Sequence, residues 1–143
     1  MIDLPTAVQT FFLAWQGLPV TLLMVFVPLL LALPCGFAMA VVNMRRVPVL
    51  CPLCRVFISF TRGVPLIVQI FLIYNSLPSL LNLVFNTLGI PFDVFGVNPV
   101  VYALLVFTLC ETAILAEVFR GAMSGIDPGQ LEAAESVGLT LTQ

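Results

Sequence analysis

The sequence predicts an all-α integral membrane protein, and three observations support this prediction. Of the 143 residues, 61% are hydrophobic and only 8% are charged, whereas soluble domains are about 45–50% apolar and about 25% charged. The mean hydropathy of +1.17 implies more apolar surface than a core of this size can bury. The apolar residues form long runs rather than the short alternating segments of barrel strands, and such runs are typical of membrane helices.

Three apolar stretches are long enough to cross a bilayer, because about 20 helical residues span about 30 Å of hydrocarbon. They cover residues 18–42, 64–85 and 99–119. Pro28 and Pro34 lie inside the first stretch and predict a bent helix. The sequence therefore predicts three transmembrane helices.

The five basic residues are all arginines, and their positions predict an orientation. Four lie between the first and second stretches, one follows the third, and none lies before residue 18 or within 86–98: they are Arg45, Arg46, Arg55, Arg62 and Arg120. Cytoplasmic flanks collect Lys and Arg. We therefore expect residues 44–62, interpreted as a loop, and the C-terminal tail to face the cytoplasm. The N-terminus would face outward, where Phe11, Phe12 and Trp15 suit an interfacial helix or an aromatic anchor.

The cytoplasmic segment 124–143 carries local signals for a short helix at 128–136. Asp127 is a helix cap, Pro128 suits the first helical position, and Gln130 occupies the third, as in a capping box. Gly138 supplies a left-handed stop. So short a helix needs a surface to lie on. The pattern leaves two surfaces open: the protein's own membrane domain with its lipid headgroups, and a groove on a cytosolic partner.

The same segment contains a recognisable motif. Glu132-Ala133-Ala134, followed by three residues and Gly138, resembles the EAA loop of bacterial ABC importer permeases. The surrounding residues 116–140, AEVFRGAMSGIDPGQLEAAESVGLT, are similar to the polar amino acid branch of that family.

Two further blocks extend this resemblance over nearly the whole chain, in the family's order. Residues 62–78, RGVPLIVQIFLIYNSLP, resemble the family's Arg-Gly-x-Pro-Leu-x-x-Gln segment, in which Arg62 and Pro65 would be structural or transmission residues. Gly17 with Thr21-Leu22 resembles the start of its first helix. The chain thus resembles the permease subunit of a polar amino acid ABC importer.

The resemblance implies a function and a set of partners. Glu132, Ala133, Ala134 and Gly138 would form a coupling helix that docks on a cytosolic ATP-binding subunit, and an extracytoplasmic binding protein would deliver the amino acid. A second permease copy or a paralogue would complete the pore in the bacterial cytoplasmic (inner) membrane. ATP hydrolysis belongs to the partner, and this chain has no phosphate-binding loop. We therefore expect no enzyme activity and no cofactor.

The resemblance also bears on the length of the chain. The family has five spans, with the N-terminus outside and the EAA loop inside, which agrees with the orientation predicted from the arginines. Its pattern continues past the glycine of the EAA loop to two more spans. Residues 1–143 are therefore expected to be a fragment that forms a partial permease domain with three of the five spans.

Several polar residues inside the predicted spans are candidates for the substrate path. An ionised group such as Glu111 in a helix centre costs about 2.5–3.5 kcal/mol on insertion scales. Glu111 either lines the path and meets a substrate ammonium group, or is protonated and hydrogen-bonded to a neighbouring helix. Gln69 and Asn75 either face the same path or join helices, the commoner role of such residues.

Glu117 and Arg120 are three residues apart at the end of the third span, where they are neighbours on a helix. They predict an interfacial ion pair, placed to transmit movement of the coupling segment. Cys51 and Cys54 form a C-x-x-C pair in the cytoplasmic stretch, but without histidine or a second pair they predict neither a metal site nor a redox site.

Other classes of function find less support. The scattered arginines form no basic stripe for nucleic acid, and no catalytic dyad is recognisable. The main alternative is a small three-span membrane protein with a binding or regulatory role and no transport activity.

Overall fold

The computed structural model describes residues 3–139, and these form helices without any strand. In chain order the helices are α1 (Leu4–Met44), α2 (Leu50–Gly63), α3 (Leu66–Thr87), α4 (Pro99–Ser124) and α5 (Pro128–Ser136). Helices α1, α3 and α4 are long and apolar enough to cross a membrane. The predicted fold class, all-α with three membrane helices, is therefore confirmed.

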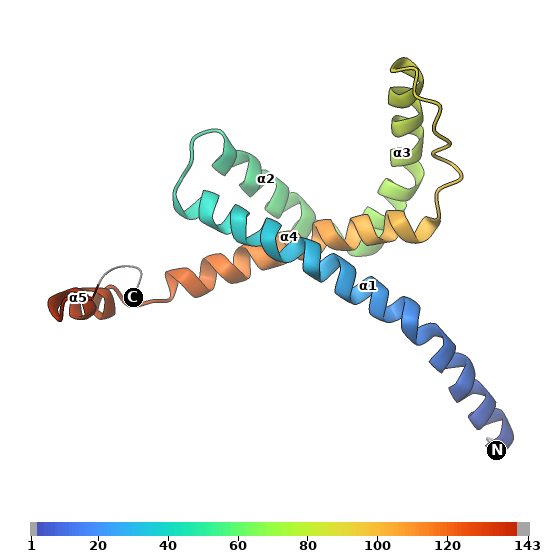
Figure 1. The fold of residues 1–143 in the computed structure, drawn as a ribbon, viewed down its shortest axis with the longest axis horizontal. Helices are drawn as coiled ribbons and strands as arrows, with labels where there is room; N and C mark the ends of the chain where they lie inside the picture. The colour runs from blue at the N-terminus through green and yellow to red at the C-terminus, as the bar shows by residue number, and fades with distance from the viewer. Residues whose placement is uncertain (1–2, 140–143) are drawn as a thin grey trace.

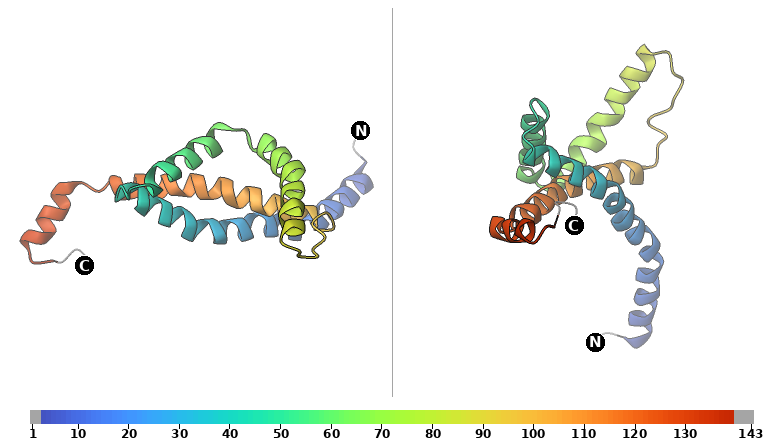
Figure 2. Two further views of the ribbon diagram at one scale, coloured as in Figure 1. Left: turned by 90° about the horizontal axis from the view of Figure 1, so that it is seen from above. Right: turned by 60° about the vertical axis from the view of Figure 1, so that its left-hand side comes forward.

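Helix α1 is longer than the sequence suggested. Its 41 residues correspond to about 60 Å at 1.5 Å per residue, twice the thickness of the hydrocarbon layer. The N-terminal aromatic segment is the beginning of α1 and not a separate interfacial helix, since the helix continues through Pro19. Pro28 and Pro34 lie inside α1, which follows a curved course in Figures 1 and 2.

The prediction of a loop over residues 44–62 was wrong, because residues 50–63 form α2. Cys51, Ile58 and Thr61 are buried along one side of this helix, and Ile58 belongs to a cluster with Ala113 and Ala116 of α4. Their spacing is helical. The arginines concealed that pattern, since Arg45 and Arg46 precede α2 and Arg55 and Arg62 lie on its exposed part.

Helix α4 is the centre of the fold and contacts α1, α2 and α3. Helices α1 and α4 lie side by side and cross, with the N-terminus and α5 at far ends of the molecule (Figures 1 and 2). Buried residues recur every fourth position along α1: Pro28, Ala32, Gly36 and Ala40. A Cβ atom on Gly36 would lie only 2.8 Å from Leu115 Cβ of α4. Small residues thus allow the two backbones to approach closely, as is common in membranes.

The connection between α3 and α4 is ordered by local hydrogen bonds. The Asp93 carboxylate accepts from the backbone N–H groups of Phe95 and Gly96, and the Asn98 side chain caps α4 by accepting from Val100 N. The buried Tyr102 hydroxyl donates to the Val94 carbonyl at 2.9 Å. These bonds fix the connection against the first turn of α4, while α3 itself points away from the crossing of α1 and α4 (Figure 1).

Candidate functional site

Helix α5 forms where the local signals predict it, at residues 128–136. The Asp127 carboxylate accepts from Gly129 N at 2.8 Å, and Pro128 occupies the first turn. Gly138 ends the segment with φ +83°, a left-handed conformation that is strained for residues with a Cβ atom. The hydrogen bonds of the described chain include no return bond from the Gln130 side chain, so at the N-terminus of α5 the side-chain cap is Asp127 alone.

Helix α5 stands apart from the other helices and contacts none of them within residues 3–139. It extends from the end of α4 away from the α1–α4 crossing (Figures 1 and 2). Glu132 and Ala133 are exposed, Ala134 is half-buried, and Val137 is 75% exposed. The four EAA-motif residues therefore lie on a preformed but uncovered segment. Residues 140–143 lie outside the described part of the chain.

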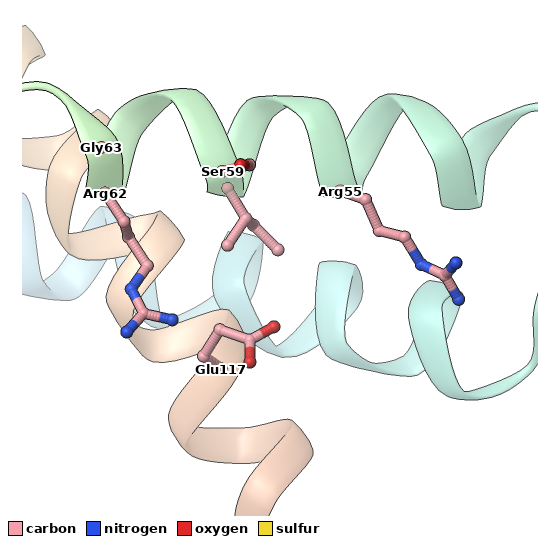
Figure 3. A pocket seen from close by; sticks show the side chains of 6 residues that line it. Arg55, Ser59, Arg62, Gly63 and Glu117 are labelled. Carbon is pink, nitrogen blue, oxygen red and sulfur yellow. The ribbon is translucent and has the colours of Figure 1, made fainter.

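The predicted ion pair at the end of α4 is present. Arg120 Nη2 lies 2.8 Å from Glu117 Oε2, and Arg120 Nε donates to both carboxylate oxygens at 3.1–3.2 Å. Glu117 also lines a hollow of about 440 Å³ between α2 and α4. Arg55, Ser59 and Arg62 of α2 also line this hollow. The Arg62 guanidinium extends toward Glu117, whereas the Arg55 side chain extends away from Glu117 along α2 (Figure 3).

Gln69 lies at the junction of three helices. Its Nε2 donates to the backbone carbonyls of Thr61 and Val64, at 2.7 and 2.8 Å, and so satisfies the C-terminal end of α2. Its Oε1 accepts from the Cys110 thiol of α4 at 3.1 Å. The side chain is buried. This geometry favours the interpretation that Gln69 joins helices, while a place on the substrate path stays a prediction.

Asn75 and Glu111 have different surroundings. Asn75 Nδ2 donates to Phe71 O on its own helix at 2.7 Å, and Asn75 lines a hollow of about 280 Å³ with Tyr74 and Tyr102. Glu111 is half-buried, and its Oε2 atom is buried without a hydrogen-bond partner in the described chain. The structure does not join Gln69, Asn75 and Glu111 into one site, and a path-lining role for Asn75 and Glu111 stays a prediction.

The other site predictions concern single positions. Pro65 precedes α3 in an extended conformation with ψ 139° and marks the bend between α2 and α3. Cys51 donates to Asn43 Oδ1 at 3.5 Å, and both residues are buried.

The residues that the sequence analysis missed are the small ones on α1. Their four-residue spacing is visible in the sequence and could have identified a close helix contact.

Together, the three membrane-length helices and the uncovered short helix define a multi-pass helical membrane protein. No family model matches the chain. The probable amino-acid permease protein YxeN of Bacillus subtilis is 37% identical over 142 residues, which is 99% of this chain and 59% of that relative. The L-cystine transport system permease protein TcyL of the same species is 35% identical, over 88% of this chain and 50% of the relative.

A solved structure gives the same result. The chain matches the crystal structure of an amino acid ABC transporter with histidines, with a TM-score of 0.74 and 26% sequence identity, over 99% of this chain and 60% of the other. The chain belongs to the amino-acid ABC transporter permeases, as the sequence motifs predicted. It spans between half and three fifths of the length of these two relatives.

Proposed function

We propose that this chain is the membrane permease subunit of an ABC transporter that imports polar amino acids. In this proposal α5 couples the permease to ATP hydrolysis in a cytosolic partner subunit. The observation that carries the proposal is the state of α5: it is capped at both ends, it presents the EAA motif, and no helix of residues 3–139 covers it.

The composition of α5 favours a protein groove over a lipid surface. Its sequence, PGQLEAAES, contains two glutamates and no basic residue. The cytoplasmic leaflet carries anionic lipids, which would repel these carboxylates. A helix of nine residues is also marginal on its own, and the Asp127 cap and the Gly138 turn reduce the conformational entropy lost when it docks. Helix-in-groove binding is a common use of such segments.

The attachment of α5 supports a role in transmission. Only residues 125–127 separate it from α4, and α4 contacts α1, α2 and α3. Movement of α5 during ATP-driven closure of the partner would therefore act on the centre of the fold. The Glu117–Arg120 ion pair joins neighbouring turns near the end of α4. Arg62 and Glu117 line the hollow between α2 and α4. This is consistent with the predicted transmission roles of these three residues.

The complete transporter needs further components. We propose a second permease copy or a paralogue, an extracytoplasmic amino-acid-binding protein, and the bacterial inner membrane with the N-terminus outside. L-cystine is the first substrate to test, because one relative is named for its transport. Glu111 is the candidate for contact with the substrate ammonium group, since its buried Oε2 lacks a partner in the described chain.

The test uses the full-length permease with its ATP-binding subunit and binding protein. The variants are Glu132→Ala and Gly138→Ala. The control is Gln130→Ala, which truncates an exposed side chain on the side of α5 opposite to Glu132. Recovery of the assembled complex and uptake of labelled L-cystine and L-glutamine are measured in proteoliposomes. We expect Glu132→Ala to reduce complex recovery at least about fivefold, the effect of losing a docking residue worth about 1 kcal/mol.

Gly138→Ala should reduce both readouts because the left-handed backbone costs about 1–2 kcal/mol with a Cβ atom, while Gln130→Ala stays within twofold of the unsubstituted protein. If both variants assemble and transport normally, the assignment of α5 as a coupling helix is wrong. If the unsubstituted protein assembles with partners but moves no amino acid, a binding or regulatory role replaces transport.

A further inference from the structure

Helix α2 has three chemically different sides. One side is buried against the rest of the fold, as described above. A second side exposes large apolar side chains at helical spacing: Leu53, Val56 and Phe60 are 61%, 68% and 57% exposed. The third side carries Arg55, Ser59 and Arg62, which line the hollow between α2 and α4 (Figure 3). An exposed apolar stripe beside a cationic stripe is typical of a helix at a membrane surface.

The hollow has an excess of positive charge. Arg55 and Arg62 form no ion pair within residues 3–139, where the one salt bridge joins Glu117 to Arg120. Among residues 3–139, Glu117 is the one acidic residue that lines the hollow. Its two oxygens already accept hydrogen bonds from Arg120, which offsets its repulsion of an anion. The guanidinium groups of Arg55 and Arg62 therefore remain available to bind one, and guanidinium groups match phosphate oxygens well.

We propose that this hollow binds the phosphate headgroup of an anionic phospholipid, with the acyl chains along the apolar stripe Leu53–Val56–Phe60. The adjacent stripe favours a lipid over a free anion, because only a lipid would cover both surfaces together. Its position also fits, since the hollow lies near the end of the membrane helix α4. In the orientation of the proposed function, on which this step rests, that end faces the cytoplasmic leaflet, where anionic lipids are concentrated. A lipid held there bridges α2 and α4 beside the ion pair.

The experiment measures lipid binding to the purified protein in neutral detergent by native mass spectrometry. Dioleoyl phosphatidylglycerol is compared with dioleoyl phosphatidylcholine, which has the same acyl chains and no net charge. Inorganic phosphate is added as a competitor. The variant is Arg55→Gln/Arg62→Gln, and the control is Arg45→Gln/Arg46→Gln, which removes two positive charges just before α2 but outside the hollow. All four arginines are exposed, so both proteins should fold.

We expect tighter binding of phosphatidylglycerol than of phosphatidylcholine. Each Arg near a membrane surface contributes about fivefold to the attraction, so Arg55→Gln/Arg62→Gln should weaken phosphatidylglycerol binding about 30-fold, while the control changes it less than threefold. Millimolar phosphate should not displace the lipid.

Four results would overturn the proposal. The first is equal affinity for the two lipids, and the second is unchanged phosphatidylglycerol affinity in Arg55→Gln/Arg62→Gln. The third is an equal loss of phosphatidylglycerol affinity in the control variant. The fourth is displacement of the lipid by phosphate, which would identify a free-anion site.

Discussion

Replacing Gly36 with alanine tests the crossing of α1 and α4. The added Cβ atom would lie 2.8 Å from Leu115 Cβ, 3.1 Å from Ala116 N and 3.2 Å from Thr112 O. Contacts under 3.0 Å require movement, and two of the three atoms belong to the backbone of α4, which cannot rotate away. Overpacking of this kind costs about 1–3 kcal/mol. Because alanine is favoured over glycine in a helix interior by about 1 kcal/mol, we expect Gly36→Ala to lower the free energy of unfolding by up to about 2 kcal/mol.

Gly17 provides the matched control, because it lies on the same helix and an added Cβ atom there meets nothing within 4 Å. Alanine is favoured over glycine in helix interiors by about 1 kcal/mol, so Gly17→Ala should be neutral or slightly stabilising. The assay is titration of the protein from mild detergent into SDS, with unfolding followed by circular dichroism. If Gly36→Ala unfolds at the same SDS fraction as Gly17→Ala, the close contact between α1 and α4 is not part of the folded protein.

Two other predictions concern buried hydrogen bonds and use the same unfolding assay. Gln69→Leu leaves two carbonyls at the end of α2 without their donor, and should destabilise the protein by about 1–3 kcal/mol. The control is Asn75→Ala, which removes a bond within an exposed turn and should change stability by less than about 0.5 kcal/mol. Similar losses in both variants would contradict the assigned role of Gln69. Tyr102→Phe removes the bond to the α3–α4 connection and should cost about 1 kcal/mol; no loss of stability would show that this bond is not formed in the membrane protein.

The parts of the fold that the sequence predicted depend on signals within a short stretch of chain. Long apolar runs predict α3 and α4, because a membrane helix satisfies its backbone hydrogen bonds internally. The caps of α5 likewise lie within a few residues of the helix itself. In both cases the physical cause is local, so composition and spacing are sufficient.

Helix α2 and Gln69 show why the rest was not predictable. The buried side of α2 is defined by contact with α4, which is distant in sequence, and the arginines on its exposed side make the stretch look like a polar loop. Gln69 was identified as a polar residue in an apolar span, but its partners depend on the bend at Pro65 and on the approach of Cys110. Sequence patterns show that a buried amide needs partners, and only the fold shows which groups provide them.

The contacts of α4 suggest how a displacement of α5 would be distributed. The contact of α4 with α1 is close and is made by small residues and backbone atoms. Such a contact has no flexible side chains to absorb a shift. We therefore expect α1 and α4 to move together. Toward α3, the Cys110 thiol of α4 donates to Gln69 Oε1, and a thiol is a weak donor. Under the proposed function, α1 and α4 would form the moving unit, and the junction of α2 and α3 at Gln69 would be the place where the fold adjusts.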